Sequence, residues 1–351
     1  MAWTPTNLPK RTGVYTRYVD RTETIPQGGP RGIVAMPLSD SDGTAVTGRI
    51  YEVGRVSEAV ELFGADNIDA IRLIFEHGAN KVLVYVLPAD LTDFDYSAMF
   101  DEFLSRDFNV FVLDQDDDPT LQSEVLSFIA DGRDEDKHFF VVFGGTAEDD
   151  EDPTAGNTRS STLEDEYSVN LISGVVRGED ELSSAEFSPA LAGLIAGNPL
   201  NETVTYKRVS ADDVTKRLKN SEFETAIEAG SLALLYDGDQ VKVEKGITTT
   251  GENIRSVQTR HTILNDVPRF LRSEVVAQID NSEDGRESVR SMIARYMESL
   301  AQDGVINSDP GNEPEVYLDP DNPPVEDAAF FTIEYTDQFS MERIFLTVVR
   351  R

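Results

Sequence analysis

The sequence predicts a mixed fold of the α+β and α/β kinds, with an α/β layered domain that contains a largely parallel sheet. Strand-like and helix-like segments alternate through the first half of the chain, and continuous apolar runs such as Lys81–Leu87 are typical of strands covered on both faces. The last third instead contains two predicted helices and a half-exposed strand. Because 351 residues exceed what one hydrophobic core usually organises, we expect two domains.

The first half supplies the elements of the layered domain. Hydrophobic periodicity predicts helices that end where a glycine follows, as at Gly64 and Gly78. The expected strands are 31–38, 81–87, 108–113, 139–143 and 168–172, and the expected helices are 57–64, 67–77, 120–130 and 188–196. We interpret 146–166 as a long acidic loop, and 232–243 as a hairpin that turns at Asp237-Gly238.

The last third has a different pattern. We expect a strand over 254–264, a helix over 267–279 with Pro268 in its first turn, and a helix over 283–302. The apolar residues of this last helix, from Val289 to Leu300, recur at a spacing that places them on one face and makes the helix amphipathic. A loop over 309–327 then leads to an alternating strand at 331–335.

Both chain ends carry a strand-like segment with no evident local partner. The first is Gly13–Val19, and the second is Ile344–Val349, which runs almost to the terminus. Chain ends are usually polar, and an unpaired strand promotes aggregation unless a partner is intended. The ends therefore suggest a subunit that completes its sheets with its neighbours.

The charge is extreme and unevenly spread. The formal net charge is −34, with eight Lys and 23 Arg against 65 acidic residues. Residues 93–186 contain 26 acidic and five basic residues, so we expect this part to face solvent. Residues 255–295 contain seven Arg and six acidic residues, so this part could either bind an acidic partner or pair with its own acids, such as Asp266, Glu274 and Glu287.

Composition also excludes several classes of function. An acidic surface argues against nucleic-acid binding, and no apolar run of membrane-spanning length occurs. The start of the chain does not resemble a secretory signal, so we expect synthesis in the cytoplasm. High acidity with little Lys also suits a protein kept soluble in high salt.

The motifs of catalysis and cofactor binding are missing from the sequence. There is no cysteine, no phosphate-binding loop, and no residue arrangement that would make His77, His138 or His261 catalytic, so we expect no cofactor. The acidic string Asp114–Asp118 follows a strand, where metal-binding carboxylates often occur. It fails as a calcium-binding loop, because Pro119 and Val125 stand where Gly and Glu are needed.

The order of these segments resembles that of contractile tail sheath proteins, which occur in myovirus tails, contractile bacteriocins and related injection systems. The resemblance rests on Gly13-Val14-Tyr15, Arg31–Val34, Phe75–Val84, the Gly246–Thr250 segment with the Arg260 strand after it, and the C-terminal strand. It covers both ends and the chain up to about Leu87. It is weak from Asp90 to Lys242, where sheath proteins vary.

The resemblance implies a structural protein rather than an enzyme. An inner sheath-type domain would combine an N-terminal arm (1–22) with residues 245–351, including a C-terminal arm (343–351), and the α/β domain (23–244) would be inserted, with its acidic part (93–186) outside. Subunits would form a helical polymer of stacked hexameric rings around an inner tail tube, in a virion tail assembled in the host cytoplasm. Other partners would be baseplate and tail-terminator proteins.

The resemblance also implies which residues make the contacts between subunits. The arms would exchange strands with neighbours, through the residues Val14, Tyr15, Thr16, Arg17, Tyr18, Ile344, Phe345, Leu346, Thr347, Val348 and Val349. The residues facing the tube would be Arg269, Arg272, Arg286, Arg290 and Arg295. Two alternatives remain: a halophilic α/β enzyme with a metal at Asp114–Asp118, and another structural subunit of the same particle.

Overall fold

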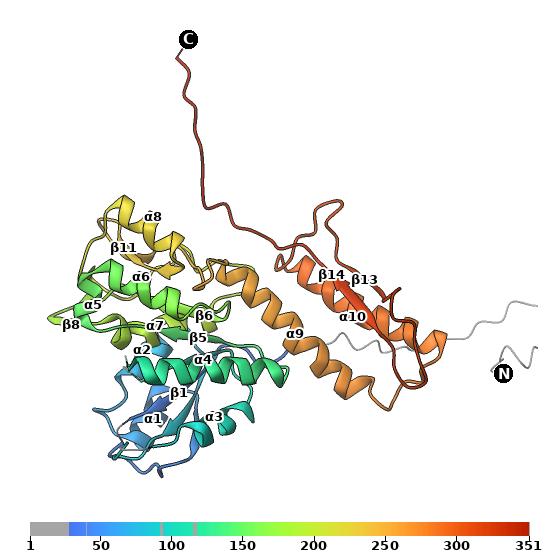
Figure 1. Cartoon of the computed structure of the whole chain (residues 1–351), viewed down its shortest axis with the longest axis horizontal. Helices are drawn as coiled ribbons and strands as arrows, with labels where there is room; N and C mark the ends of the chain where they lie inside the picture. Colours follow the sequence, from blue (N-terminus) through green and yellow to red (C-terminus); the bar gives the residue numbers. More distant parts are fainter. Residues whose placement is uncertain (1–27, 40, 92–93, 115–117, 351) are drawn as a thin grey trace, which may run out of the picture.

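The computed structural model describes residues 28–350, except 40, 92–93 and 115–117. Figure 1 shows an α/β body from which helix α9 (Ile254–Glu274) extends to a smaller unit. That unit consists of helix α10 (Glu283–Gln302) and the strands β13 (Glu315–Leu318) and β14 (Phe331–Glu334). Among the described residues, no helix combines the length and apolar composition needed to span a lipid bilayer.

A seven-stranded sheet forms the centre of the body, in the order β10-β6-β5-β4-β1-β3-β2. All neighbouring strands are parallel except β2 and β3, which are antiparallel. The strands are β1 (Ile33–Leu38), β2 (Ile50–Val53), β3 (Lys81–Val86), β4 (Val110–Val112), β5 (Phe140–Phe143), β6 (Ser168–Leu171) and β10 (Ser231–Leu232). The predicted parallel sheet is therefore confirmed, and its central strands are buried on both faces, as their continuous apolar sequences require.

Helices cover the sheet, and helix α7 is the most deeply buried of those described. The helices are α1 (Val56–Phe63), α2 (Asp69–Glu76), α3 (Ser97–Leu104), α4 (Pro119–Asp134), α5 (Ala147–Glu151), α6 (Pro153–Thr162), α7 (Ser184–Gly197) and α8 (Asn220–Glu228). Helix α7 packs against α2 so closely that a Cβ at Gly193 would lie 2.3 Å from the Ile74 carbonyl oxygen. Only glycine permits this approach.

Two small sheets complete the body. Strands β7 (Val175–Arg177), β8 (Asp180–Leu182) and β9 (Asp213–Val214) pair in the order β8-β7-β9. Strands β11 (Leu234–Tyr236) and β12 (Val241–Val243) form an antiparallel hairpin. The hairpin predicted at Asp237-Gly238 is confirmed, and Gly238 has the positive φ of 101° that such a turn needs.

Helix α9 passes from one hydrophobic core to a second one between Val257 and Ile263. The first core runs from Ile33 to Val257, and the second from Ile263 to Val316. Helix α9 contributes side chains to both cores. The domain limits expected from the sequence, 23–244 and 245–351, stay predictions.

Four sequence predictions are wrong. The loop expected at 146–166 contains helices α5 and α6, because Thr146 and Asp152 cap their first turns and Pro153 occupies the first position of α6. The strand expected at 254–264, including the Arg260 strand of the resemblance, is helical. It joins the helix expected after it, and Pro268 lies inside α9 rather than in its first turn. The loop expected at 309–327 contains β13, which pairs with β14.

A buried carboxyl group joins α5 to the start of α7. Asp150 is 4% exposed and accepts hydrogen bonds of 2.6 Å from both the backbone N–H and the hydroxyl of Ser184. Burial raises the pKa of Asp150 from 3.8 to about 6, against the opposing effect of these hydrogen bonds. The folded protein therefore holds a proton on Asp150 over a pH range in which the unfolded chain releases it.

We predict that Asp150→Asn changes how stability depends on pH. Because the pKa of Asp150 is raised, its contribution to the free energy of unfolding falls as the pH rises from 3.8 towards about 6. The free energy of unfolding of the variant, relative to the original protein, should rise by about 2–3 kcal/mol between roughly pH 4 and pH 7, as urea denaturation can measure. The control is Asp149→Asn in the same helix, and a difference for Asp150→Asn that does not vary with pH would contradict the assignment.

Candidate interaction surfaces and the polar junction

The end of the described chain forms an extended segment that leaves the rest of the protein (Figure 1). Its apolar side chains face solvent: Phe345 is 90% exposed and Val348 is 94% exposed. No strand is assigned to Ile344–Val349, so the strand expected there has no partner among the described residues. A run of exposed apolar residues is costly in water, and it is typical of a surface that binds a partner.

The contacts predicted between subunits also include residues near the N-terminus. Val14, Tyr15, Thr16, Arg17 and Tyr18 lie outside the described residues. The pairing of both terminal segments with other subunits stays a prediction.

The sheet of β13 and β14 has two strands in the described part of the chain, and the outer edge of β13 receives one hydrogen bond, from Arg290 to the Val316 carbonyl oxygen. The two strands are antiparallel, with Glu315 opposite Glu334 and Leu318 opposite Phe331, and no third strand is assigned to this sheet among the described residues. Exposed apolar side chains lie along the surrounding chain, at Leu318, Val325, Phe330, Phe339 and Met341. A short two-stranded sheet with apolar surroundings suits the addition of a strand from another chain.

The structure separates the five arginines predicted to face a tube. On α9, Arg269 lies 2.5 Å from Asp107 and Arg272 lies 3.7 Å from Asp136, so both pair with carboxylates of the body. The other three lie on α10. Their contacts are as follows: Arg286 donates to Asn281, Arg290 pairs with Glu287 and donates to the Val316 carbonyl oxygen, and Arg295 also has a partner within the chain.

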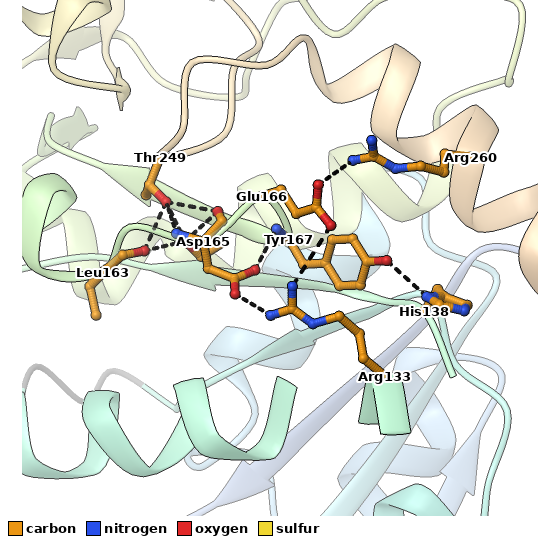
Figure 2. A network of polar contacts seen from close by, with 9 residues as sticks. Arg133, His138, Leu163, Asp165, Glu166, Tyr167, Thr249 and Arg260 are labelled. Atoms are coloured by element: carbon orange, nitrogen blue, oxygen red, sulfur yellow. Dashed lines mark hydrogen bonds and ion pairs between the residues drawn. The ribbon is translucent and has the colours of Figure 1, made fainter. Parts of the chain in front are cut away.

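A polar junction connects the body to helix α9 (Figure 2). Arg133 from the end of α4 pairs with Asp165, and its other guanidinium nitrogen lies 3.7 Å from Glu166. Glu166 in turn lies 2.9 Å from Arg260 of α9. The Glu166 carboxylate thus lies between Arg133 of α4 and Arg260 of α9, and it connects both helices to the loop before β6.

The loop before β6 is held at this junction by a threonine from a distant part of the chain. The Thr249 hydroxyl donates to the carbonyl oxygens of Leu163 and Asp165, and it accepts from the Asp165 backbone N–H at 2.9 Å. Thr249 belongs to the Gly246–Thr250 segment, which is one of the segments whose sequence resembles that of sheath proteins. No local sequence pattern indicates that Arg133 pairs with Asp165, because the two residues are 32 positions apart.

The histidines have structural positions in this fold. His138 Nδ1 lies 2.8 Å from the Tyr167 hydroxyl, whose ring also lies against the Arg133 guanidinium and the buried His261. Burial, with the positive charges of Arg260 and Arg133 nearby, lowers the pKa of His261 well below its ordinary value, so His261 is neutral. His77 accepts from the Ser210 backbone N–H at 3.0 Å and contacts the Leu73 carbonyl oxygen.

The acidic string Asp114–Asp118 is only partly described, since residues 115–117 lie outside the described chain. Asp114 accepts from the Ser39 backbone N–H at 3.0 Å, and Asp118 caps the first turn of α4 through Thr120. Both carboxylates thus have structural roles. Elsewhere in the described ranges, no group of three or more His, Asp or Glu side chains is arranged to hold a metal ion.

The fold resembles that of solved sheath proteins. The sheath tail protein from Desulfitobacterium hafniense aligns with a TM-score of 0.70 and 19% identity, over 93% of this chain and 100% of that one. The helical sheath of the anti-feeding prophage in its contracted state aligns with a TM-score of 0.74 and 16% identity, over 98% of this chain and 100% of that one. At these identities the likeness is one of fold.

Sequence comparison finds similarity to tail sheath proteins. Residues 89–249 match the model of the phage tail sheath protein central domain. The tail sheath protein of Clostridium phage phiCD119 is 21% identical over 155 residues, which cover 41% of this chain and 44% of that protein, so the match spans less than half of the relative's length. These findings confirm the resemblance to contractile tail sheath proteins. The family match covers residues 89–249. This is largely the part of the chain, from Asp90 to Lys242, in which individual motifs resemble sheath proteins least.

We predict that the polar junction stabilises the fold mainly through Asp165. Its side chain is largely buried, pairs with Arg133 and accepts from the Tyr167 backbone N–H at 2.8 Å. Asp165→Ala leaves both donors without this acceptor and should lower the free energy of unfolding by about 2 kcal/mol, measured by urea denaturation. The control is Glu252→Ala, because Glu252 is an exposed partner of Arg260 and its loss should cost about 0.5 kcal/mol or less. Equal effects of the two substitutions would contradict this account.

Proposed function

We propose that this chain is a structural subunit of a contractile tail sheath, which polymerises with copies of itself. The observation that carries the proposal is the exposed apolar segment Ile344–Val349, which has no strand partner in the described part of its own subunit. The family match over 89–249 and the fold shared with the sheath of the anti-feeding prophage support it. The role is mechanical, and it needs neither a cofactor nor a catalytic group.

The proposed subunit is joined to its neighbours by strand addition. The segment Ile344–Val349 of one copy adds to an edge of the β13–β14 sheet of another, and Val14–Tyr18 of the N-terminal arm does the same. Backbone hydrogen bonds supply such a joint with affinity, and alternate side chains buried at the edge supply specificity. A joint of this kind keeps subunits connected while the polymer changes shape.

The proposed polymer consists of stacked hexameric rings around an inner tube, located in the tail of a virion or related particle assembled in the host cytoplasm. The inner domain combines residues 1–22 with 245–351, and the inserted α/β domain (23–244) presents its acidic part, 93–186, to the outside. Baseplate and tail-terminator proteins bind the two ends of the polymer. One solved relative belongs to the baseplate of the anti-feeding prophage, which supports the baseplate contact.

We predict that polymerisation requires both terminal segments. The purified protein should form tubular polymers visible by electron microscopy, and deletion of residues 1–20 or 343–351 should abolish them, because each deletion removes one of the exchanged strands. A matched pair of point variants tests strand pairing more finely. Leu346→Pro removes a backbone donor and should prevent assembly, whereas Leu346→Val keeps a strand-forming residue and should preserve it. Normal polymers from the truncated proteins would contradict the linkage.

We also propose that α10 carries the contact with the inner tube, through Arg286, Arg290 and Arg295. Arg269 and Arg272 pair with carboxylates of the body, whereas Arg290 pairs with Glu287 of α10 itself, so a contact through α10 would leave the ion pairs between α9 and the body intact. The double variant Arg286→Glu/Arg290→Glu should lower co-sedimentation of the polymer with the tube protein of the same particle by about tenfold, because charge reversal at an interface is repulsive. The control is Arg217→Glu, an exposed arginine of the body. Unchanged co-sedimentation of the double variant would exclude these arginines from the contact.

A further inference from the structure

Helix α9 holds the chain immediately after the N-terminal arm. Asp266 of α9 is 4% exposed and has three donors from two separate parts of the chain. The Gly29 backbone N–H donates to its Oδ1 at 2.7 Å, and Arg31 and the Tyr296 hydroxyl donate to its Oδ2 at 2.9 Å and 2.6 Å. The start of the described chain, α9 and α10 thus meet at one carboxylate.

A side chain at Gly28 or Gly29 would require the polar groups around Asp266 to shift. A Cβ at Gly29 would lie 2.8 Å from both the Asp266 Oδ1 and the Arg269 Nη1, and a Cβ at Gly28 would lie 2.8 Å from the Arg31 Nη2. Burial, with the charge of Asp266 beside it, raises the pKa of the Tyr296 hydroxyl above its ordinary value. That hydroxyl therefore stays protonated at neutral pH and donates to Asp266.

The same helix also holds the chain immediately before the C-terminal segment. Arg255, in the first turn of α9, is 6% exposed and donates to the Ser340 hydroxyl at 3.0 Å and to the Gly304 carbonyl oxygen at 2.7 Å. Next to it, the Asn253 side chain donates to Glu342 at 3.3 Å. Beyond Glu342 the chain runs exposed to its end.

We propose that helix α9 sets the spacing and direction of the two terminal segments, with Asp266 and Arg255 as the positioning residues. Eleven residues separate them, so the two points of attachment lie about 16 Å apart along a rigid helix. This inference rests on the proposed exchange of both segments between subunits. Each subunit then offers its neighbours two strands whose origins keep a fixed separation, whatever the arrangement of the subunits around it.

The absence of cysteine makes the spacing measurable in the full-length chain. Cysteines introduced at the exposed residues Pro30 and Arg343, next to the two points of attachment, can carry spin labels whose distance distribution is recorded by pulsed electron paramagnetic resonance. The original background should give one narrow distribution. Tyr296→Phe, which removes one donor to Asp266, and Gly29→Ala, which crowds it, should each broaden the distribution.

Matched controls separate positioning from loss of fold. Tyr206→Phe removes an exposed hydroxyl, and Gly54→Ala adds a Cβ whose nearest neighbour is 3.7 Å away, so both should leave the distribution narrow. Tyr296→Phe should also raise the critical concentration for polymerisation about tenfold, equivalent to about 1.4 kcal/mol. The melting temperature of the unassembled subunit should change by less than about 4 °C.

The outcomes distinguish this inference from the proposed function. A narrow, unchanged distribution in Tyr296→Phe and Gly29→Ala would overturn the positioning role, even where the original protein polymerises. A broadened distribution with unchanged polymerisation would overturn the link between positioning and assembly. Failure of the original protein to polymerise would count against the proposed function, while the distance measurement would still decide whether α9 positions the two segments.

Discussion

Helix α9 must satisfy two hydrophobic cores at once, and the rest of the structure depends on this constraint. Ile254 and Val257 belong to the core of the α/β body, whereas Ile263, Val267 and Phe270 belong to the core shared with α10. Each such side chain contributes about 1.5–3 kcal/mol when fully buried. Polar groups of the helix also face the body, since Asn265 exchanges hydrogen bonds with the His138 backbone and Arg260 pairs with Glu166.

This arrangement explains how a chain with such unequal parts can act as one mechanical element. The body is stabilised by a buried parallel sheet, and the smaller unit by one face of α10 against α9. Gly29, near the start of the described chain, and Ser340, near its end, both bond to side chains of α9, at Asp266 and Arg255. A force applied through either segment would therefore reach the helix that both cores hold.

Much of the fold could be predicted from the sequence because its main elements carry strong local signals. Apolar runs such as Lys81–Val86 predicted the strands of the central sheet. The regular apolar face from Val289 to Leu300 predicted α10. The predictions failed where tertiary packing decides the structure. Residues 254–264 include several β-branched residues and read as a strand, but Asn253 caps a helix there, and contacts with both cores stabilise it. The attachment at Asp266 joins residues that are 235 and 237 positions apart in the sequence, and the attachment at Arg255 joins residues that are 85 positions apart. No spacing within a single sequence indicates such pairs.

The most direct measurement is a reconstruction of the assembled polymer by electron cryomicroscopy, at a resolution that traces the backbone. The account predicts that Ile344–Val349 of each subunit lies as an added strand against the β13–β14 sheet of a neighbouring subunit, with α9 unchanged from its structure in the single chain. It would be contradicted by a polymer in which Ile344–Val349 folds back onto its own subunit, or in which subunits meet only through their α/β bodies.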